Sequence, residues 1–285
     1  MSENFQRLLS ATIDHLEILK GRGTNYVTVD SATLAGLRQP ARFATAHSKQ
    51  EERRAPAVEK SSPSTMPEIV SPQAKISTHE KQAAINELKN RAMVCVKCPN
   101  LAASRTKVVF GVGDIEATLM FVGEAPGADE DRIGEPFVGK AGELLTRIIQ
   151  TMGFSRETIF IANVLKCRPD MPSETSGNRK PTTDEMKRCL PYLLEQIDII
   201  KPRVIIALGA TAVEGLFGKP MPITKLRGTW QTFKDTPVMP TFHPSYLLHN
   251  QALSEKRKVW EDMLQVLEKL DAPISEKQRN YFLKA

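Results

Sequence analysis

The sequence lacks the features that would place the protein in a membrane or in a repeat architecture. Its 285 residues contain no internal repeat and no run of about 18 apolar residues, the length that a membrane-spanning helix needs. Residues 1–20 are polar and carry acids, unlike a secretory signal. We therefore expect a cytoplasmic protein without membrane contact, with one sizeable core or two small ones.

The charge of the chain permits a nucleic-acid partner without requiring one. The formal net charge is +6 and the isoelectric point is about 9.1, which is also common in proteins that bind no nucleic acid. Six basic residues fall within residues 166–188: Lys166, Arg168, Arg179, Lys180, Lys187 and Arg188. This basic span predicts either a nucleic-acid contact or an ordinary solvated face.

The N-terminal part of the chain differs in composition from the rest. Residues 1–20 predict an amphipathic helix that could dock a partner protein, with apolar residues at helical spacing: Phe5, Leu8, Leu9, Ile13, Leu16 and Leu19. Residues 21–76 are rich in Pro, Ser, Thr and Arg, a composition typical of a disordered linker. Ser77 and Glu80 form a capping-box pattern, so we expect the folded domain to span residues 77–285.

Within residues 77–285, short β-like runs alternate with helical patterns. Strands are predicted at 107–110, 117–122, 158–164, 203–208 and 238–242, and helices at 140–152, 182–200, 210–217 and 254–270. Such alternation predicts an α/β fold, a three-layer α/β/α sandwich around a mainly parallel central sheet.

The most informative stretch is the loop that follows the apolar run 117–122. Gly123, Pro126 and Gly127 end this run abruptly, and a helical pattern begins at Lys140. In open α/β sheets the ligand crevice lies at the carboxyl ends of strands, where residues 124–139 are placed. The loop alone is a weak signal, because a glycine-rich strand-to-helix turn with acids is a phosphate or metal site about as often as a solvated turn.

The four cysteines of the chain form one pattern: Cys95-x2-Cys98, followed by Cys167 and Cys189. A cytoplasmic protein seldom forms disulfides, and a C-x2-C pair readily binds a metal, so the pattern favours a site with four thiolate ligands. Ordinary buried thiols are the alternative. The spacing does not separate zinc from an iron–sulfur cluster, since both accept four thiolates.

Three motifs resemble those of one known family. G-E-A-P-G-A-D-E-D-R-I-G-E-P-F-V-G-K-A-G after the first strand, N-V-L-K-C-R-P at 163–169 and H-P-S-Y-L-L at 243–248 resemble, in this order, motifs of the family 4 uracil-DNA glycosylases. The resemblance covers roughly residues 90–270. It implies a glycosylase that hydrolyses the N-glycosidic bond of deoxyuridine in single- or double-stranded DNA, leaving an abasic site for base excision repair. It also implies a [4Fe–4S] cluster on the four cysteines that pins the basic span beside the DNA.

The resemblance also implies roles for individual residues. Glu124 would orient or activate the water, and His243 would donate a hydrogen bond to the uracil oxygen as charge develops on the leaving base. Asn163 would recognise the Watson–Crick edge of uracil. The remaining substrate-binding positions are Ala125, Glu130 as a brace of the loop or of the water, Phe137 as a stacking ring, and Leu247 or Leu248 as a wedge in the duplex. Each has a structural alternative, such as loop solvation, strand-end bonding or helix packing.

Three alternatives to a family 4 enzyme remain at this point. A family 5-like glycosylase with a broader range of deaminated bases lacks the motif glutamate, so Glu124 disfavours it. A related branch traps DNA through a histidine in a basic loop, and residues 168–188 contain no histidine. The third is an iron–sulfur DNA-binding accessory module of a polymerase, which the joint presence of Glu124, Asn163 and His243 disfavours. We expect a monomer.

Overall fold

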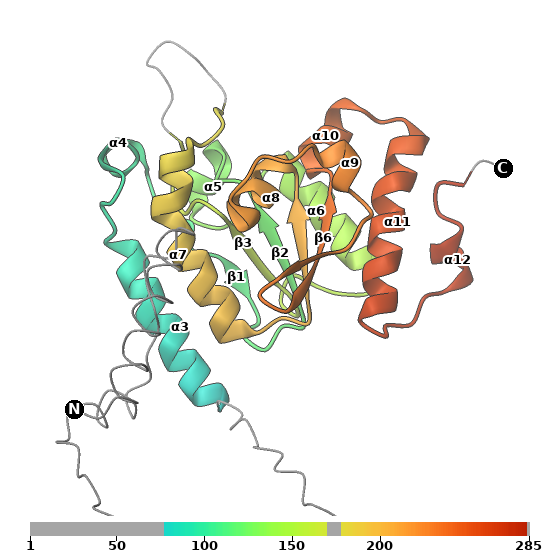
Figure 1. The fold of residues 1–285 in the computed structure, drawn as a ribbon, viewed down its shortest axis with the longest axis horizontal. Helices are drawn as coiled ribbons and strands as arrows, with labels where there is room; N and C mark the ends of the chain where they lie inside the picture. Colours follow the sequence, from blue (N-terminus) through green and yellow to red (C-terminus); the bar gives the residue numbers. More distant parts are fainter. Residues whose placement is uncertain (1–76, 170–177, 284–285) are drawn as a thin grey trace, which may run out of the picture. The chain divides into compact units, whose positions relative to one another are not determined.

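Six strands form one sheet at the centre of the described structure (Figure 1). The computed structural model describes residues 77–169 and 178–283, all of which belong to one compact unit, Ser71–Ala285. The expected helix of residues 1–20 and the expected linker of residues 21–76 lie outside the described residues.

The sheet is mainly parallel, as predicted. Its order is β1-β3-β2-β4-β6-β5, and the four inner strands are parallel neighbours: β3 (Phe160–Asn163), β2 (Leu119–Gly123), β4 (Val204–Leu208) and β6 (Thr236–Thr241). The antiparallel edges are β1 (Val112–Gly113) and β5 (Gln231–Phe233). The chain moves from β2 to one neighbour, β3, and then to the other, β4, so the strand order reverses beside β2. Ligand crevices form at such a reversal.

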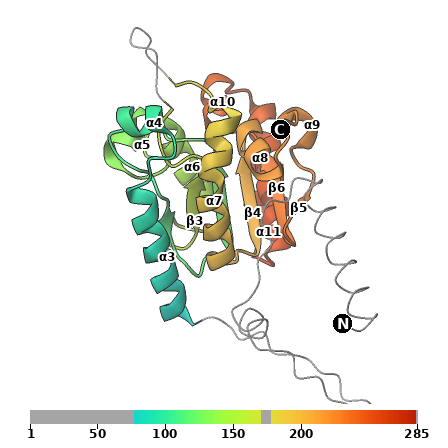
Figure 2. The ribbon, with the colours of Figure 1, turned by 60° about the vertical axis from the view of Figure 1, so that its left-hand side comes forward.

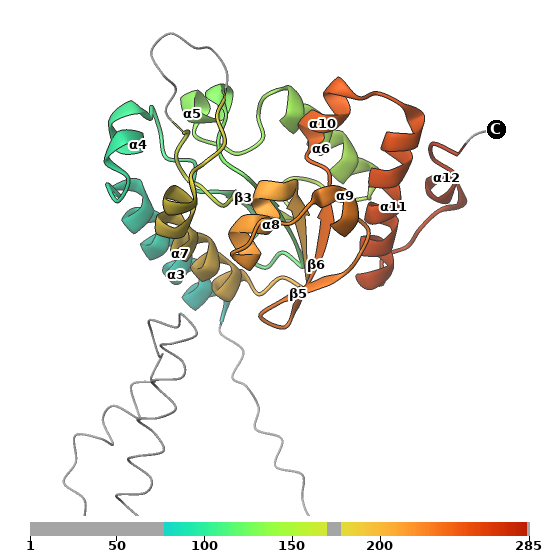
Figure 3. The same cartoon turned by 45° about the horizontal axis from the view of Figure 1, so that its top comes forward.

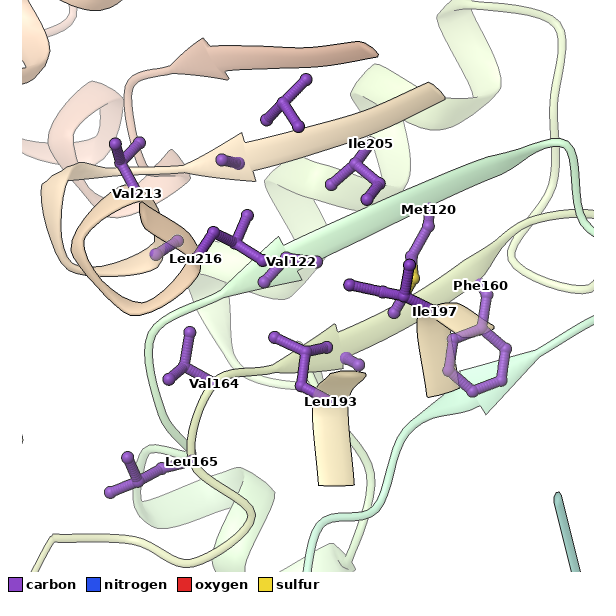
Figure 4. Close-up of a cluster of buried hydrophobic side chains, with 14 of the residues drawn as sticks. Met120, Val122, Phe160, Val164, Leu165, Leu193, Ile197, Ile205, Val213 and Leu216 are labelled. Carbon is purple, nitrogen blue, oxygen red and sulfur yellow. The ribbon is translucent and has the colours of Figure 1, made fainter. Parts of the chain in front are cut away.

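One face of the sheet is covered by α7 (Thr183–Ile200) and α8 (Ala210–Phe217). Met120 and Val122 of β2 join Leu193 and Ile197 of α7 in the core on this face (Figure 4). All five residues of β2 are buried, which is why its sequence is continuously apolar and not alternating.

The opposite face is covered by α6 (Lys140–Thr151) and α11 (Leu253–Lys269). Leu119 and Phe121 point to this side, since successive side chains of a strand alternate between faces. Helices on both faces confirm the predicted three-layer α/β/α sandwich.

The long helix α3 (Thr78–Met93) lies beside α7 (Figure 2). It begins where the sequence predicts, because the Ser77 hydroxyl accepts the N–H of Glu80 while the Glu80 carboxylate accepts the N–H of Ser77. Ile85 and Leu88 pack with Tyr192 of α7 in a separate cluster. This helix carries the chain to Cys95.

Short helices occupy the connections: α4 (Pro99–Ser104), α5 (Ala128–Ile133), α9 (Ile223–Leu226), α10 (Pro244–His249) and α12 (Glu276–Arg279). Figure 3 shows α5 and α10 toward the upper edge, beyond the ends of the inner strands. In residues 77–169 and 178–283, no helix is both long and apolar enough to cross a bilayer.

One prediction about the sheet edges is wrong, and one edge strand is missing from the prediction. Residues 107–110 form no strand; the N–H of Val109 donates to the carbonyl of Lys166, and the short strand β1 begins only at Val112. Gly111, at φ +135°, bends the chain between them. The hairpin of β5 and β6 is absent from the prediction, because its turn at Lys234 and Asp235 has positive φ but contains no glycine.

Candidate active site

A cleft of about 450 Å³ opens at the carboxyl ends of the four parallel strands. Its wall includes residues 124–127 after β2, Asn163 at the end of β3, residues 209–211 after β4, and His243 after β6. Six of the seven residues that the sequence predicts for catalysis and substrate binding line it: Glu124, Ala125, Glu130, Phe137, Asn163 and His243. Parallel strands that end at one edge explain how residues so distant in sequence converge.

Glu124 follows directly on the end of β2. Its carbonyl accepts the N–H of Leu165 at 3.0 Å, which fastens the start of the loop to the segment after β3. Across residues 77–169 and 178–283, its carboxylate forms no hydrogen bond or ion pair. The main chain is therefore fixed while the carboxylate remains available to a ligand in the cleft.

Glu130 closes the same loop on itself. Its Oε2 accepts the N–H of Gly127 at 3.0 Å, and its Oε1 accepts the N–H groups of Val138 and Gly139, both at 3.0 Å. One carboxylate thus ties the N-terminus of α5 to the N-terminus of α6. The loop that carries Glu124 is ordered before any ligand binds.

Phe137 lies at the back of the cleft with its main chain held under strain. Its φ of +55° is unusual for a residue with a side chain. The Arg156 guanidinium secures this conformation, since it donates to the carbonyl of Phe137 at 3.1 Å and to that of Pro136 at 2.7 Å. The phenyl ring lies 5.6 Å from the His243 ring, between centroids.

Gly123 creates the space between Phe137 and Asn163. A Cβ atom at this position would stand 2.6 Å from Cζ of Phe137 and 2.4 Å from Oδ1 of Asn163. The absence of a side chain at Gly123 therefore allows both groups to reach the cleft floor.

Asn163 presents an unsatisfied acceptor. The residue is 2% exposed, and its Oδ1 has no hydrogen-bond partner within residues 77–169 and 178–283. Buried polar atoms are nearly always paired, and an unpaired one costs about 1–3 kcal/mol. A ligand that donates a hydrogen bond in the cleft would remove this cost.

His243 is the N-cap of α10, and this position fixes its tautomer. Its Nδ1 accepts the N–H of Ser245 at 3.2 Å and lies 2.7 Å from the Ser245 hydroxyl. A neutral imidazole whose Nδ1 accepts carries its proton on Nε2. Burial lowers the pKa of His243 to about 4, although Glu130 opposes this, so the ring is a neutral donor at physiological pH.

The two leucines predicted as wedge candidates differ in exposure. Leu247 is 5% exposed and packs with Phe242 and Val259, which matches the alternative interpretation of helix packing. Leu248 is half-buried and lines a second, smaller hollow beside α10. Of the pair, Leu248 is therefore the more accessible.

The basic span is largely engaged in contacts within the protein. Lys166 is buried, and Arg179 pairs with Glu185 at 2.7 Å, which holds the pKa of Glu185 at about 2. Lys180 pairs with Glu214 at 2.6 Å. Three of the six basic residues of the span are therefore buried or paired within the protein. Fewer cations are left for solvent or for DNA than the sequence suggests.

Cys95, Cys98, Cys167 and Cys189 are free thiols that line one small cavity, so the structure brings the four predicted metal ligands together. Arg105 donates to Sγ of Cys167 at 3.2 Å, and the N–H of Lys166 donates to Sγ of Cys189 at 3.2 Å. Burial raises the pKa of Cys189 to about 12, so a bound metal would have to supply the charge that deprotonates it.

The four thiols are not grouped around a single point. Among the described residues, no three His, Cys, Asp or Glu side chains have the geometry of a site for one metal ion. A cubane cluster binds each thiolate to a separate iron and so accepts sulfurs that stand further apart than the ligands of one ion. The cavity that the four thiols share and the N–H donors to two of the sulfurs are compatible with such a cluster.

Comparison with known proteins establishes the family. The chain matches the Uracil DNA glycosylase superfamily model over residues 110–264, more than half of its length. A type-4 uracil-DNA glycosylase of Thermotoga maritima is 44% identical over 189 residues, which cover 65% of this chain and 94% of that protein. The chain belongs to the type-4 uracil-DNA glycosylases.

Two further relatives support the type-4 assignment over a type-5 one. A type-4 uracil-DNA glycosylase of Sulfurisphaera tokodaii is 40% identical over 209 residues, 70% of this chain and 90% of that protein. A type-5 uracil-DNA glycosylase of Pyrobaculum aerophilum is 26% identical over 164 residues, 47% of this chain and 70% of that protein. The resemblance that the motifs predicted is confirmed.

Three residues that shape the cleft of this type-4 family member are missing from the sequence-based prediction. Ser245 lies inside the H-P-S-Y-L-L motif, so the motif carried a signal for it. Gly123 is predicted only as the end of a strand, whereas it also makes room for two side chains. Arg156 has no motif around it, and its contact with Phe137 spans 19 positions of sequence.

Proposed function

We propose that this protein hydrolyses the N-glycosidic bond of deoxyuridine in DNA and leaves an abasic site. The observation that carries the proposal is the unpaired Oδ1 of Asn163 in a cleft that also contains Glu124, Phe137 and His243. A planar base that donates from a ring N–H and accepts at a flanking carbonyl satisfies an amide in this position. Uracil has this pattern, whereas cytosine has an acceptor where uracil has its ring N–H.

The charges in the cleft suit bond cleavage between sugar and base. As the bond breaks, negative charge develops on the base and positive charge on the sugar, and groups that meet these charges lower the barrier. The neutral His243 donates from Nε2 to the base oxygen. The Glu124 carboxylate orients the attacking water and stabilises the cationic sugar.

Base recognition requires the nucleotide to leave the duplex stack. Phe137 stacks on the extruded base, a contact worth about 1–3 kcal/mol, and Ala125 and Glu130 belong to the loop around it. Leu248, the more accessible leucine of α10, fills the space that the base leaves, with Leu247 supporting it from the core.

The decisive experiment is a glycosylase assay on single- and double-stranded oligonucleotides that contain one uracil. We expect excision by the parent protein. Asn163→Asp replaces the amide donor by an ionised acceptor, so uracil excision should fall and trace cytosine excision should appear. Asn178→Asp is the matched control, since Asn178 also lines the cleft but pairs with Arg168.

The outcomes of this assay separate the alternatives. A parent protein that binds uracil-containing DNA without cleaving it would support the accessory module of a polymerase. Excision of other deaminated bases at the same rate would support a family 5-like range. Equal loss of uracil excision in Asn163→Asp and Asn178→Asp would remove Asn163 from base recognition.

We also propose that the four cysteines hold a [4Fe–4S] cluster. When bound, the cluster would supply a structural cross-link and no catalytic step. The support is the single cavity shared by all four thiols and the N–H donors aimed at two of them. Anaerobically purified protein should be brown and contain about four irons per chain, whereas stoichiometric zinc without visible absorption would contradict the proposal.

Four expectations accompany the proposal. Uracil-containing DNA is the substrate partner, and a protein partner would dock on residues 1–20. A monomer and a cytoplasmic location are tested by light scattering and by cell fractionation. Recovery of the protein mainly in a membrane or periplasmic fraction would contradict the expected cytoplasmic location.

A further inference from the structure

Lys166 is a buried cation that the proposed chemistry does not use. It is 2% exposed and is among the largest side chains that are fully buried. Its ammonium donates to the main-chain carbonyl of Asn163 at 2.8 Å and to Oε1 of Gln196 at 2.6 Å. Gln196 is itself buried and donates to the carbonyl of Phe110 at 2.9 Å.

No carboxylate accompanies this ammonium. Among the described residues, none pairs with Lys166 as an ion pair. The ionisable group with which it interacts is the thiol of Cys189, whose Sγ also accepts the N–H of Lys166.

A buried ammonium is costly for a protein that needs only a filled space. An apolar side chain of similar length would serve packing equally well or better, because it avoids the desolvation of a charge. The position of Lys166 therefore calls for a role that uses either its charge or its direct bond to Asn163. Lys166 can use both, because it lies in the segment 163–167, which leads from the Asn163 amide to Cys167 of the cysteine site.

We propose that Lys166 is a positioning residue that couples the two sites: its ammonium fixes the main chain under the Asn163 amide and offsets the negative charge of the cysteine site. The proposed effect on Asn163 rests on the proposed function, and the proposed effect on the cysteine site rests on the proposed cluster. The carbonyl of Asn163 lies at the end of β3, so the bond from Lys166 holds the main chain from which the side-chain amide extends.

The test compares Lys166→Met with Gln196→Leu. Lys166→Met removes the charge and the bond to Asn163 while keeping a long flexible side chain. Gln196→Leu removes the other acceptor of the ammonium and leaves the bond to Asn163 in place, so it reports on damage to the buried network alone. Both variants should lose thermal stability, because each leaves a buried carbonyl without its donor.

Only Lys166→Met should change recognition and the cluster. We expect its single-turnover uracil excision to fall about tenfold, the effect of one misplaced hydrogen bond, and its uracil-to-cytosine preference to fall with it. The reduction potential of its cluster should become more negative, because a nearby cation that favours electron uptake is gone. Gln196→Leu should keep the parent preference and the parent potential.

Equal preference and equal potential in Lys166→Met and the parent protein would overturn the inference. So would a matching change in Gln196→Leu, which would reduce Lys166 to a structural role. If Lys166→Met does not fold, Lys166→Gln removes the charge with a polar side chain and is judged by the same two measurements. A parent protein without uracil excision would refute the proposed function, while the potential would still decide the role of Lys166 toward the cysteine site.

Discussion

The cleft and the cysteine site use neighbouring stretches of chain but are built differently. In the cleft, the ends of four parallel strands each contribute part of the wall, and hydrogen bonds from main-chain N–H groups to carbonyls and to the Glu130 carboxylate fix the loops between them. In the cysteine site, thiols from the turn at 95–98, the segment after β3 and α7 line a small cavity, with two N–H donors aimed at sulfur.

The cleft and the cysteine site therefore depend on different interactions for their structure. Sheet topology places the groups proposed for catalysis, because the parallel strands that carry them end at one edge of the sheet. The cysteine site gathers buried thiols with raised pKa values, an arrangement that gains stability only when a positive centre binds them. Changes to the cleft should therefore alter activity with little change in stability, and changes at the cysteines should do the reverse.

Removal of the cleft's two charge-handling groups should give the largest effect on activity. We expect Glu124→Ala and His243→Ala each to lower single-turnover uracil excision by about 10²-fold or more, the contribution of one positioned acid, base or donor. Glu135→Ala, an exposed acid of the same loop, is the control. Iron content and DNA binding should remain near parent values, and a parent-like rate in either variant would exclude that residue from catalysis.

A methyl group at Gly123 should clash with the side chains of Asn163 and Phe137 and so distort the cleft. Gly123→Ala brings Cβ into Asn163 Oδ1 and the Phe137 ring, so we expect excision to fall at least about tenfold, the cost of misplacing one recognition bond. Gly218→Ala is the matched control, because its left-handed φ of +72° costs stability, about 1 kcal/mol, at a position with open space that does not line the cleft. If both variants keep full activity, the packing around Gly123 does not limit base entry.

The buried imidazole should make stability depend on pH. The folded pKa of His243, about 4, lies below its ordinary value of 6.5, so between these values the unfolded chain binds more protons. The free energy of unfolding should therefore decrease as pH falls from 6.5 to 4. His243→Gln should remove this component while keeping the dependence below pH 4.5 that the low pKa of Glu185 produces. Identical pH profiles in urea titrations of the two proteins would show that the ring is not desolvated.

The smallest effect is expected from removal of residues 1–76. A protein that begins at Ser77 keeps the capping box of α3, all four cysteines and every cleft residue. It should fold, retain its cluster and excise uracil from short oligonucleotides at nearly the full-length rate. A shortened protein that binds iron but no longer excises uracil would show that the N-terminal residues complete the cleft.

The sequence allows three of the predicted site residues to be placed in one cleft, because strand ends can be recognised in it, while their catalytic roles stay predictions. Glu124, Asn163 and His243 each follow a buried apolar run, and the parallel arrangement of those runs brings their ends to one edge. Leu247 illustrates the limit, since a motif position does not show whether a side chain faces solvent or the core.

What the sequence does not reveal arises from contacts between distant residues. The burial of Lys166 is hidden, because a lysine within a basic span looks solvent-exposed until Gln196 of α7 packs over it. The hydrogen bond from Arg156 to the carbonyl of Phe137 likewise leaves no signal in the sequence. The turn at Lys234 and Asp235 escapes detection because the turn has no glycine and lysine is not typical of positive φ.

The internal pairing of the basic span changes how DNA affinity should respond to salt. Each phosphate contact made by a lysine or arginine releases condensed counterions and steepens the logarithmic salt dependence by about 0.9 on duplex DNA. Lys166 cannot reach a phosphate from the core, and Arg179 and Lys180 already face carboxylates. The logarithmic dependence of DNA affinity on salt should therefore be clearly shallower than six such contacts would produce. The protein should bind DNA over a wider range of ionic strength than its charge suggests.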